Sequence, residues 1–314
     1  MHVYRWDLDK TYLETEIHSV RGLVRAAFER ADEKRTIPGA AALVRGLQQH
    51  DPQAQVVVLS GSPEQMRDVL SRKLELDGVR VDRLILKDNL GNLRRGRFRA
   101  VRGQVGYKLP HLLEDRLSAA HDARETLFGD DSETDALIYA AYAAVLAGDL
   151  DRDGLVKLLV AGAAYPDTIE RAVEAASRIH GGDRVDGIFI RIDRGLPIAT
   201  YRLLGPLVMP VFSWHQAALV LFARGQLSAA GAREVAAAAG GPSAVAGWTL
   251  DAVRRRLVDV DSVHSLIETQ GMDEIRALVG PEVDRLGRLP ELILPRESPD
   301  LFGFLEAARS HSAG

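Results

Sequence analysis

The chain has 314 residues, of which 46% are hydrophobic and 27% are charged. This is the composition of a folded globular protein and argues against intrinsic disorder. The net charge of −4 gives no general affinity for nucleic acid, and the lack of cysteine excludes disulfides, thiol nucleophiles and thiolate metal sites. The absence of cysteine fits a cytoplasmic protein. No signal peptide is expected, because no basic region precedes an apolar run at the N-terminus.

Strands and helices alternate along the first part of the chain. Short runs rich in β-branched residues predict strands, and periodic apolar residues predict the helices between them. This alternation predicts an α/β fold with a parallel sheet. The expected strands cover 2–6, 55–59, 81–86, 126–128 and 185–191. The expected helices cover 15–33, 40–49, 64–76, 107–119, 135–147, 155–161 and 168–179.

The second part of the chain is expected to be helical, with the sheet ending near residue 192. We therefore expect a catalytic domain at 1–194, with a helical insert at about 148–182, and a helical region at 195–314. The stretch from 289 onward contains three prolines and predicts an irregular end. The expected helices of this part cover 214–224, 229–239, 250–258, 263–269 and 273–279, with breaks at 240–242 and 280–281.

One uncharged stretch, 203–223, is long enough to cross a membrane. Gly205, Pro206, Pro210 and several polar residues interrupt it. A buried loop followed by a helix is therefore expected instead of a membrane span. We expect at most peripheral contact with a membrane.

The first expected strand ends in an acidic pair, Asp7 and Asp9, followed by Thr11. In an extended chain these three alternate residues point to one side. Two crowded carboxylates repel each other, so the pair requires a cation or a shared proton. Ser60 and Asp130 follow two other expected strands. In proteins with a parallel sheet, ligands bind beyond the carboxyl ends of the strands. We therefore expect these residues to form one site.

These residues occur in the order of the four motifs of the haloacid dehalogenase (HAD) superfamily of phosphotransferases. The matching motifs are Asp7-Leu8-Asp9-Lys10-Thr11, Ser60, Lys108 and Gly129-Asp130-x-x-x-x-Asp135. With Pro38-Gly39 and the segments 86–88, 129–139 and 187–191, the chain most resembles the lipin-related, actin-patch-type phosphatidate phosphatase catalytic domain. The resemblance covers about 1–192 and implies a HAD-like Rossmannoid three-layer sandwich.

The resemblance implies a phosphatase that forms an aspartyl-phosphate. Asp7 would be the nucleophile, Asp9 the general acid and then base, and Lys108 would neutralise the transition-state charge. The substrate would be a phosphomonoester on a small molecule, a lipid such as phosphatidate, or a protein. A bulky substrate is favoured because neither usual cap position holds a clearly folded domain. The alternative is a non-catalytic binding or regulatory protein that retains the HAD fold.

The same resemblance assigns a Mg2+ site and a phosphate site. The metal ligands would be Asp7, the carbonyl of Asp9 and Asp130, with Asp131 as an alternative to Asp130. Asp135 would be a ligand or would orient one. The phosphate would be held by Thr11, Ser60 and the amide of Gly61 near a helix N-terminus.

Each motif residue also has a purely structural interpretation. Asp7 and Asp9 could form a turn and a helix cap, and Ser62 could cap the helix that follows it. Lys108 could be a solvated helix residue, with Lys87 as a rival for its role. The run 129–132 could be a capping turn.

Four further features remain outside this scheme. Five arginines in the 87–106 loop form either a solvated loop or a contact for an anionic substrate or lipid headgroups. Residues 149–154 imitate an EF-hand loop, but Val160 occupies the position of the required glutamate, so a calcium site is rejected. His215 is expected to be a packed core histidine. Lys10 stands where relatives carry glycine or aspartate and has no explanation. The five arginines of the 87–106 loop are Arg94, Arg95, Arg97, Arg99 and Arg102.

Overall fold

A computed structural model of the chain describes residues 1–15, 30–88, 103–131, 134–193, 195–287 and 298–312. Its centre is one six-stranded sheet in the order β3-β2-β1-β4-β5-β6, and every pair of neighbouring strands is parallel. The expected α/β class with a parallel sheet is therefore confirmed. The strands are β1 (His2–Trp6), β2 (Gln55–Pro63), β3 (Arg83–Lys87), β4 (Arg124–Asp130), β5 (Val185–Arg191) and β6 (Val208–Val211).

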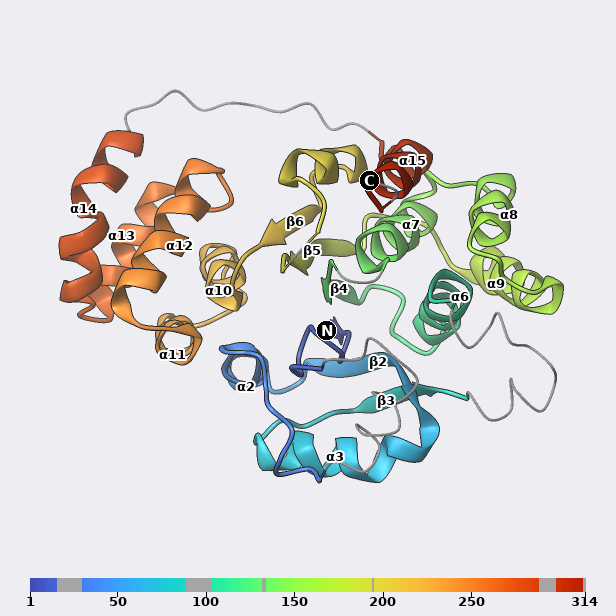
Figure 1. The fold of residues 1–314 in the computed structure, drawn as a ribbon, viewed down its shortest axis with the longest axis horizontal. Helices are drawn as coiled ribbons and strands as arrows, with labels where there is room; N and C mark the ends of the chain where they lie inside the picture. The colour runs from blue at the N-terminus through green and yellow to red at the C-terminus, as the bar shows by residue number, and fades with distance from the viewer. Residues whose placement is uncertain (16–29, 89–102, 132–133, 194, 288–297, 313–314) are drawn as a thin grey trace.

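Helices cover both faces of the sheet and produce three layers (Figure 1). One face packs against α2, α3 and α10, and the other packs against α6 and α7. The first helices are α2 (Ala40–His50), the 3-10 helix η1 (Glu64–Met66), α3 (Arg67–Leu76), α6 (Val105–Arg116), α7 (Asp135–Ala147), α8 (Arg152–Ala161) and α9 (Pro166–Arg178). The later ones are the 3-10 helix η2 (Ile198–Leu204), α10 (Trp214–Ala223), α11 (Ala229–Ala239), α12 (Pro242–Arg254), α13 (Val260–Thr269), α14 (Asp273–Gly287) and α15 (Leu301–Ser312).

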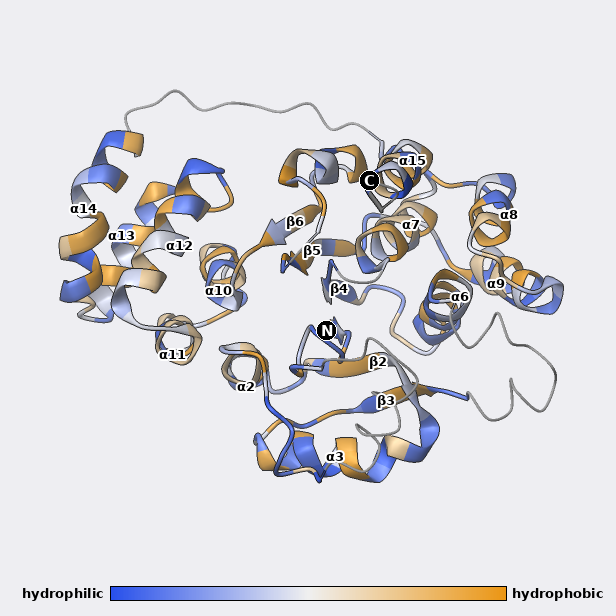
Figure 2. Ribbon diagram, viewed as in Figure 1, coloured by the Kyte–Doolittle hydropathy of each residue, from blue (hydrophilic) through white to orange (hydrophobic). Residues whose placement is uncertain are grey.

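The alternation of side chains along the strands creates an apolar core on each face of the sheet. Tyr4 and Trp6 of β1 join the core that includes α2 and α10, whereas Leu127 and Ile188 join the core that includes α6 and α7. Figure 2 shows hydrophobic residues concentrated in strands such as β2 and β5, and mixed colouring on the outer helices. Both faces of the central strands are buried, which explains their continuous β-branched runs.

The sheet does not end near residue 192 as expected, because β6 adds a sixth strand along β5. The strand contains Pro210, which lacks the N–H that a central strand requires. Since β6 lies at the edge of the sheet, one side of its backbone needs no partner, and proline is tolerated there. The uncharged stretch 203–223 therefore contains this strand as well as the expected helix.

The helical region also differs from the expected boundaries. Helix α12 begins at Pro242, a residue that suits the first turn of a helix, and it ends before 255–258. Helix α14 continues through Pro281, which lies on an exposed side where water can satisfy the carbonyl that proline leaves unbonded. The expected irregular end contains α15, whose Leu301 and Phe304 pack into the core beside α7.

Three further expectations concern a helix at 15–33, a membrane span and the domain boundary. The helix expected at 15–33 falls mostly on residues outside the described ranges, and 31–33 form a turn. No helix of the described residues is long and apolar enough to cross a membrane. The division at residue 194 stays a prediction, and one apolar core joins β1 to the helices α10 to α14.

Candidate active site

The carboxyl ends of β1 and β4 bring two aspartates together. Asp7 follows β1 and is 1% exposed, and its backbone N–H donates to the carbonyl of Phe128 in β4. Asp130 is the last residue of β4. The Thr11 hydroxyl lies 2.9 Å from Asp7 Oδ2 and 3.2 Å from Asp130 Oδ2. A hydroxyl has one hydrogen and donates to one oxygen at a time, so Thr11 links both carboxylates at the end of the sheet.

Asp135, at the start of α7, completes a compact group with Asp7 and Asp130. One carboxylate oxygen of each lies within 4.8 Å of the others, and all three residues are buried. Gly129 makes this approach possible, because a Cβ at this position would lie 2.8 Å from both Asp135 Cβ and a ring carbon of Tyr139. The glycine of the Gly-Asp motif is therefore required for the packing of α7 against β4.

Lys108 is the cation that enters this group. Its Nζ lies 2.7 Å from Asp7 Oδ1 and 2.6 Å from Asp135 Oδ1, and the residue is 0% exposed. Three buried carboxylates therefore face one lysine, and charges buried in this way require compensation. Clustered carboxylate oxygens are the ligands of hard divalent cations, so these residues fit a Mg2+ site.

Lys87, the rival lysine, is directed elsewhere. Its Nζ donates to the carbonyl of Gly103 at 2.9 Å and lies 5.1 Å from the centre of the Tyr107 ring. The two lysines are thus distinguished by geometry, and it is Lys108 that contacts Asp7.

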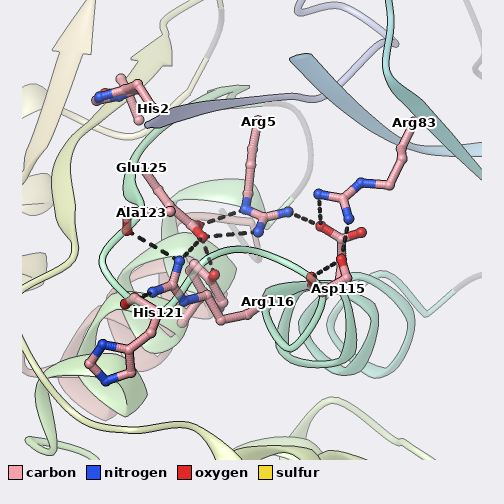
Figure 3. Close-up of polar contacts among 11 residues, drawn as sticks. His2, Arg5, Arg83, Asp115, Arg116, His121, Ala123 and Glu125 are labelled. Carbon is pink, nitrogen blue, oxygen red and sulfur yellow. Dashed lines mark hydrogen bonds and ion pairs between the residues drawn. The ribbon is translucent and has the colours of Figure 1, made fainter. Parts of the chain in front are cut away.

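A buried ion network beside Asp7 fixes α6 against β1 (Figure 3). Arg5 precedes Asp7 by two residues and therefore points to the same side of the strand. It binds Asp115 of α6 and donates to both oxygens of Glu125, at 2.6 and 3.0 Å. Asp115 follows Lys108 by seven residues, or about two helical turns, so both lie on one face of α6. Arg5 and Asp7 of the strand thus meet Asp115 and Lys108 of the helix with opposite charges.

Arg5 and Glu125 remain charged despite their burial. Burial by itself lowers the pKa of Arg5, but Glu125, Tyr142 and Asp115 together raise this pKa well above its ordinary value. Burial likewise acts to raise the pKa of Glu125, whereas Arg5, Tyr142 and Arg116 together lower it below its ordinary value. Arg116 and Tyr142 also donate to Glu125, at 3.0 and 2.7 Å, so both carboxylate oxygens of Glu125 are hydrogen-bonded inside the protein.

Asp9 points toward the end of β2. Its Oδ2 accepts hydrogen bonds from the hydroxyls of Ser60, at 3.0 Å, and Ser62, at 2.7 Å. The interpretation of Ser62 as a helix cap is wrong, because Pro63 occupies that position before η1. Gly61 lies between the two serines, and a Cβ there would lie 2.8 Å from the side-chain nitrogen Nε2 of Gln104.

Asp130 and its neighbour Asp131 have different surroundings. Asp131 lies outside the group formed by Asp7, Asp130 and Asp135, and its carboxylate accepts from the backbone N–H of Asp193 at 3.1 Å. The geometry therefore favours Asp130 over Asp131 as the candidate metal ligand.

Lys10 has an unusual backbone conformation. Its φ of 60° places it in the left-handed region, where glycine is favoured and other residues are strained. The fold requires this turn because the N–H of Lys10 donates to the carbonyl of Leu13, which closes the loop after β1. The position therefore suits glycine better than lysine.

The EF-hand-like run and His215 are not part of this group. Asp151 of the EF-hand-like run caps α8 by accepting from the N–H of Gly154. His215 is 1% exposed and its Nε2 lies 2.9 Å from the Thr249 hydroxyl. The arginine-rich part of the 87–106 loop lies outside the described residues.

Two contacts of the site were not expected from the sequence. Ser62 contacts Asp9 together with Ser60, and their spacing of two residues in a strand is a signal that could have identified the pair. Trp214 of α10 donates its indole N–H to the carbonyl of Thr11 at 3.0 Å. No local pattern connects these residues, which are 203 positions apart.

The fold and this site together define an α/β protein with a Rossmann-like sheet and a buried acidic site at the carboxyl ends of its strands. Residues 6–150 match the sequence model of the family described as "Phosphatidate phosphatase APP1, catalytic domain". The match covers somewhat less than half of the 314 residues, and it confirms the resemblance drawn from the motifs. Searches of curated proteins and of solved structures found no match.

Proposed function

We propose that the chain is a Mg2+-dependent phosphatase that hydrolyses a phosphomonoester through an aspartyl-phosphate. The observation that carries the proposal is the group of Asp7, Asp130 and Asp135 around Lys108, buried at the carboxyl ends of the strands. The family match supports a phosphatase and favours phosphatidate, a phosphorylated lipid, as the substrate.

In the first step, a carboxylate oxygen of Asp7 attacks the phosphorus and the bond to the leaving oxygen breaks. Asp9, in its protonated form, gives its proton to that oxygen, and an alcohol leaves. The two serine hydroxyls that donate to Asp9 Oδ2 hold this carboxyl group in one orientation. Lys108 offsets the negative charge of the phosphoryl group and of Asp7.

In the second step, Asp9 takes a proton from water while the water oxygen bonds to phosphorus. The bond between phosphorus and Asp7 breaks, which releases phosphate and regenerates the carboxylate. Asp7, Asp130 and Asp135, with the carbonyl of Asp9, would hold Mg2+. When bound, this ion supplies positive charge against the repulsion between the carboxylates and the phosphoryl oxygens. Thr11, Ser60 and the amide of Gly61 would complete the phosphate site.

The first experiment measures Mg2+-dependent release of phosphate from an aryl phosphate. The wild type should turn over, and Asp7→Asn, which keeps the shape of the side chain, should abolish turnover while the circular dichroism spectrum is unchanged. Full turnover by Asp7→Asn would disprove the nucleophile. A wild type without any turnover would instead favour a non-catalytic binding protein that retains the fold.

A second experiment tests the covalent intermediate. An aryl phosphate has a good leaving group and needs little help from an acid, so Asp9→Asn should still be phosphorylated but should hydrolyse slowly. Mass spectrometry of the variant should show one added phosphoryl group on the peptide that contains Asp7. Phosphatidate in mixed micelles is then compared with sugar phosphates and nucleotides to identify the substrate class.

A further inference from the structure

Two side chains from late in the sequence hold the loop that follows β1. We call residues 7–13 the Asp7 loop. Arg191 Nε donates to the carbonyl of Lys10 at 3.1 Å, and Trp214 Nε1 donates to the carbonyl of Thr11 at 3.0 Å. The two acceptors are consecutive carbonyls. Both donors lie beyond the segment 6–150 that matches the phosphatase family.

Trp214 cannot easily turn away from this loop. The residue is 0% exposed, and its ring packs edge-on against Trp6, with centroids 5.2 Å apart, and Phe128, with centroids 5.9 Å apart. Trp6 and Phe128 are themselves stacked at 4.1 Å. They are the last residue of β1 and a residue near the end of β4, so the indole is packed directly beneath the site.

The hydrogen bond from Trp214 acts on the residue that links the carboxylates. The Thr11 hydroxyl lies within hydrogen-bond distance of Asp7 Oδ2 and Asp130 Oδ2 and donates to one of them at a time, while its carbonyl accepts from the indole. Fixing the Thr11 peptide therefore fixes the direction of the hydroxyl and, through it, the positions of both carboxylates. Catalytic rates are sensitive to such small displacements.

We propose that Trp214 and Arg191 form a clamp on the Asp7 loop, and that Trp214 is a positioning residue for catalysis. The C-terminal helices thus contribute to the site through the first residue of α10. The effect on turnover rests on the proposed phosphatase function, whereas the effect on the loop does not.

The three tryptophans of the chain provide matched controls. Trp6 belongs to the same aromatic cluster and is buried, but its Nε1 has no hydrogen-bond partner among the described residues. Trp248 lies among the C-terminal helices and is partly buried. Replacing each with phenylalanine removes the same atoms, and only Trp214→Phe removes a hydrogen bond to the Asp7 loop.

The first measurement is amide hydrogen exchange, which needs no activity. The N–H groups of Lys10, Tyr12 and Leu13 are hydrogen-bonded within the loop and report on its opening. Relative to the wild type, Trp214→Phe should exchange these amides roughly fivefold faster, the effect of one lost hydrogen bond. Trp248→Phe should leave them unchanged, and Trp6→Phe should change them less than Trp214→Phe. Equal exchange in Trp214→Phe and Trp6→Phe would overturn the clamp.

The second measurement is the kinetics of hydrolysis. Trp214→Phe should lower kcat roughly tenfold with little change in KM, because the substrate still binds but the nucleophile is displaced. A kcat equal to that of Trp6→Phe would disprove the positioning role. If the wild type has no turnover but its loop amides respond as expected, the phosphatase proposal fails and the clamp stands.

Arg191→Met provides an independent test should Trp214→Phe fail to fold. It removes the hydrogen bond to Lys10 and leaves the aromatic cluster intact. Faster exchange of the loop amides is again expected. Unchanged exchange in this variant would contradict the clamp.

Discussion

Lys108 Nζ lies 2.7 Å from Asp7 Oδ1, although the two residues are 101 positions apart in the sequence. The contact depends on the register of α6 against β1. The buried pair Arg5 and Asp115 fixes this register, because Arg5 lies two residues before Asp7 and Asp115 lies two helical turns after Lys108. Removing either partner of this pair would leave an uncompensated buried charge and would strongly destabilise the fold. The ion network and the candidate site are therefore parts of one arrangement.

Replacing Lys108 with methionine should abolish turnover and make folding more dependent on Mg2+. Without the lysine, three buried carboxylates repel each other, and the free energy of unfolding in the presence of a chelator should fall by about 3–5 kcal/mol. Thermal melts with and without Mg2+ measure this effect. The ion should raise Tm more in Lys108→Met than in the wild type, since it binds the folded state. Equal shifts would contradict the metal site.

Asp130 and Asp131 form a natural pair for comparing a site residue with its neighbour. Asp130→Asn should lower turnover by at least about a hundredfold, because it removes a charged ligand from the proposed metal site. Asp131→Asn should retain turnover, since that carboxylate accepts from the Asp193 amide outside the group. The rates with saturating Mg2+ are compared. A larger loss in Asp131→Asn would assign the ligand to Asp131 instead.

Gly129→Ala should destabilise the protein by about 2–3 kcal/mol and disturb the site. Its Cβ would lie 2.8 Å from Asp135 and Tyr139, so α7 would have to shift. Gly247→Ala is the control, because no atom lies within 4 Å of a Cβ there and the residue is inside α12. That change should stabilise by roughly 0.5–1 kcal/mol. Urea unfolding measures both, and a neutral Gly129→Ala would refute the close packing.

Lys10→Gly should stabilise the fold by roughly 0.5–1 kcal/mol. Glycine adopts a φ of 60° without strain, and this gain exceeds the additional entropy of the unfolded chain. Arg256→Gly is matched, since Arg256 is also a basic residue in the left-handed region, with a φ of 57°. Both variants should show higher midpoints in urea. A lower midpoint in Lys10→Gly alone would show that the lysine side chain stabilises the loop.

His215 should make the protein sensitive to acid. Burial lowers the pKa of His215 to about 4, from 6.5 in the unfolded chain. The unfolded state therefore binds a proton first, and stability is lost as pH falls from 6.5 toward 4, by about 2 kcal/mol at pH 5. His215→Gln can still donate to Thr249 but cannot titrate. Urea unfolding at pH 7 and pH 5 should show a smaller loss in this variant. An equal loss would exclude His215 as the cause.

The order of strands and helices was largely predictable from the sequence, because buried parallel strands and amphipathic helices have strong local patterns. The β6 strand and α15 were missed. Pro210 is compatible with a strand only at the edge of the sheet, and that place in the sheet is not encoded locally. The sequence likewise predicts a break at Pro281, because the exposure that lets the helix tolerate this proline is not encoded locally.

The fold class and most residues of the site were predictable from the sequence, because three of the four motifs follow a predicted strand. The contacts among the site residues depend on the tertiary structure. It distinguished Lys108 from Lys87 and Asp130 from Asp131, and it placed Trp214 on the Asp7 loop. These choices depend on the packing of helices against the sheet, which brings together residues that no local pattern connects.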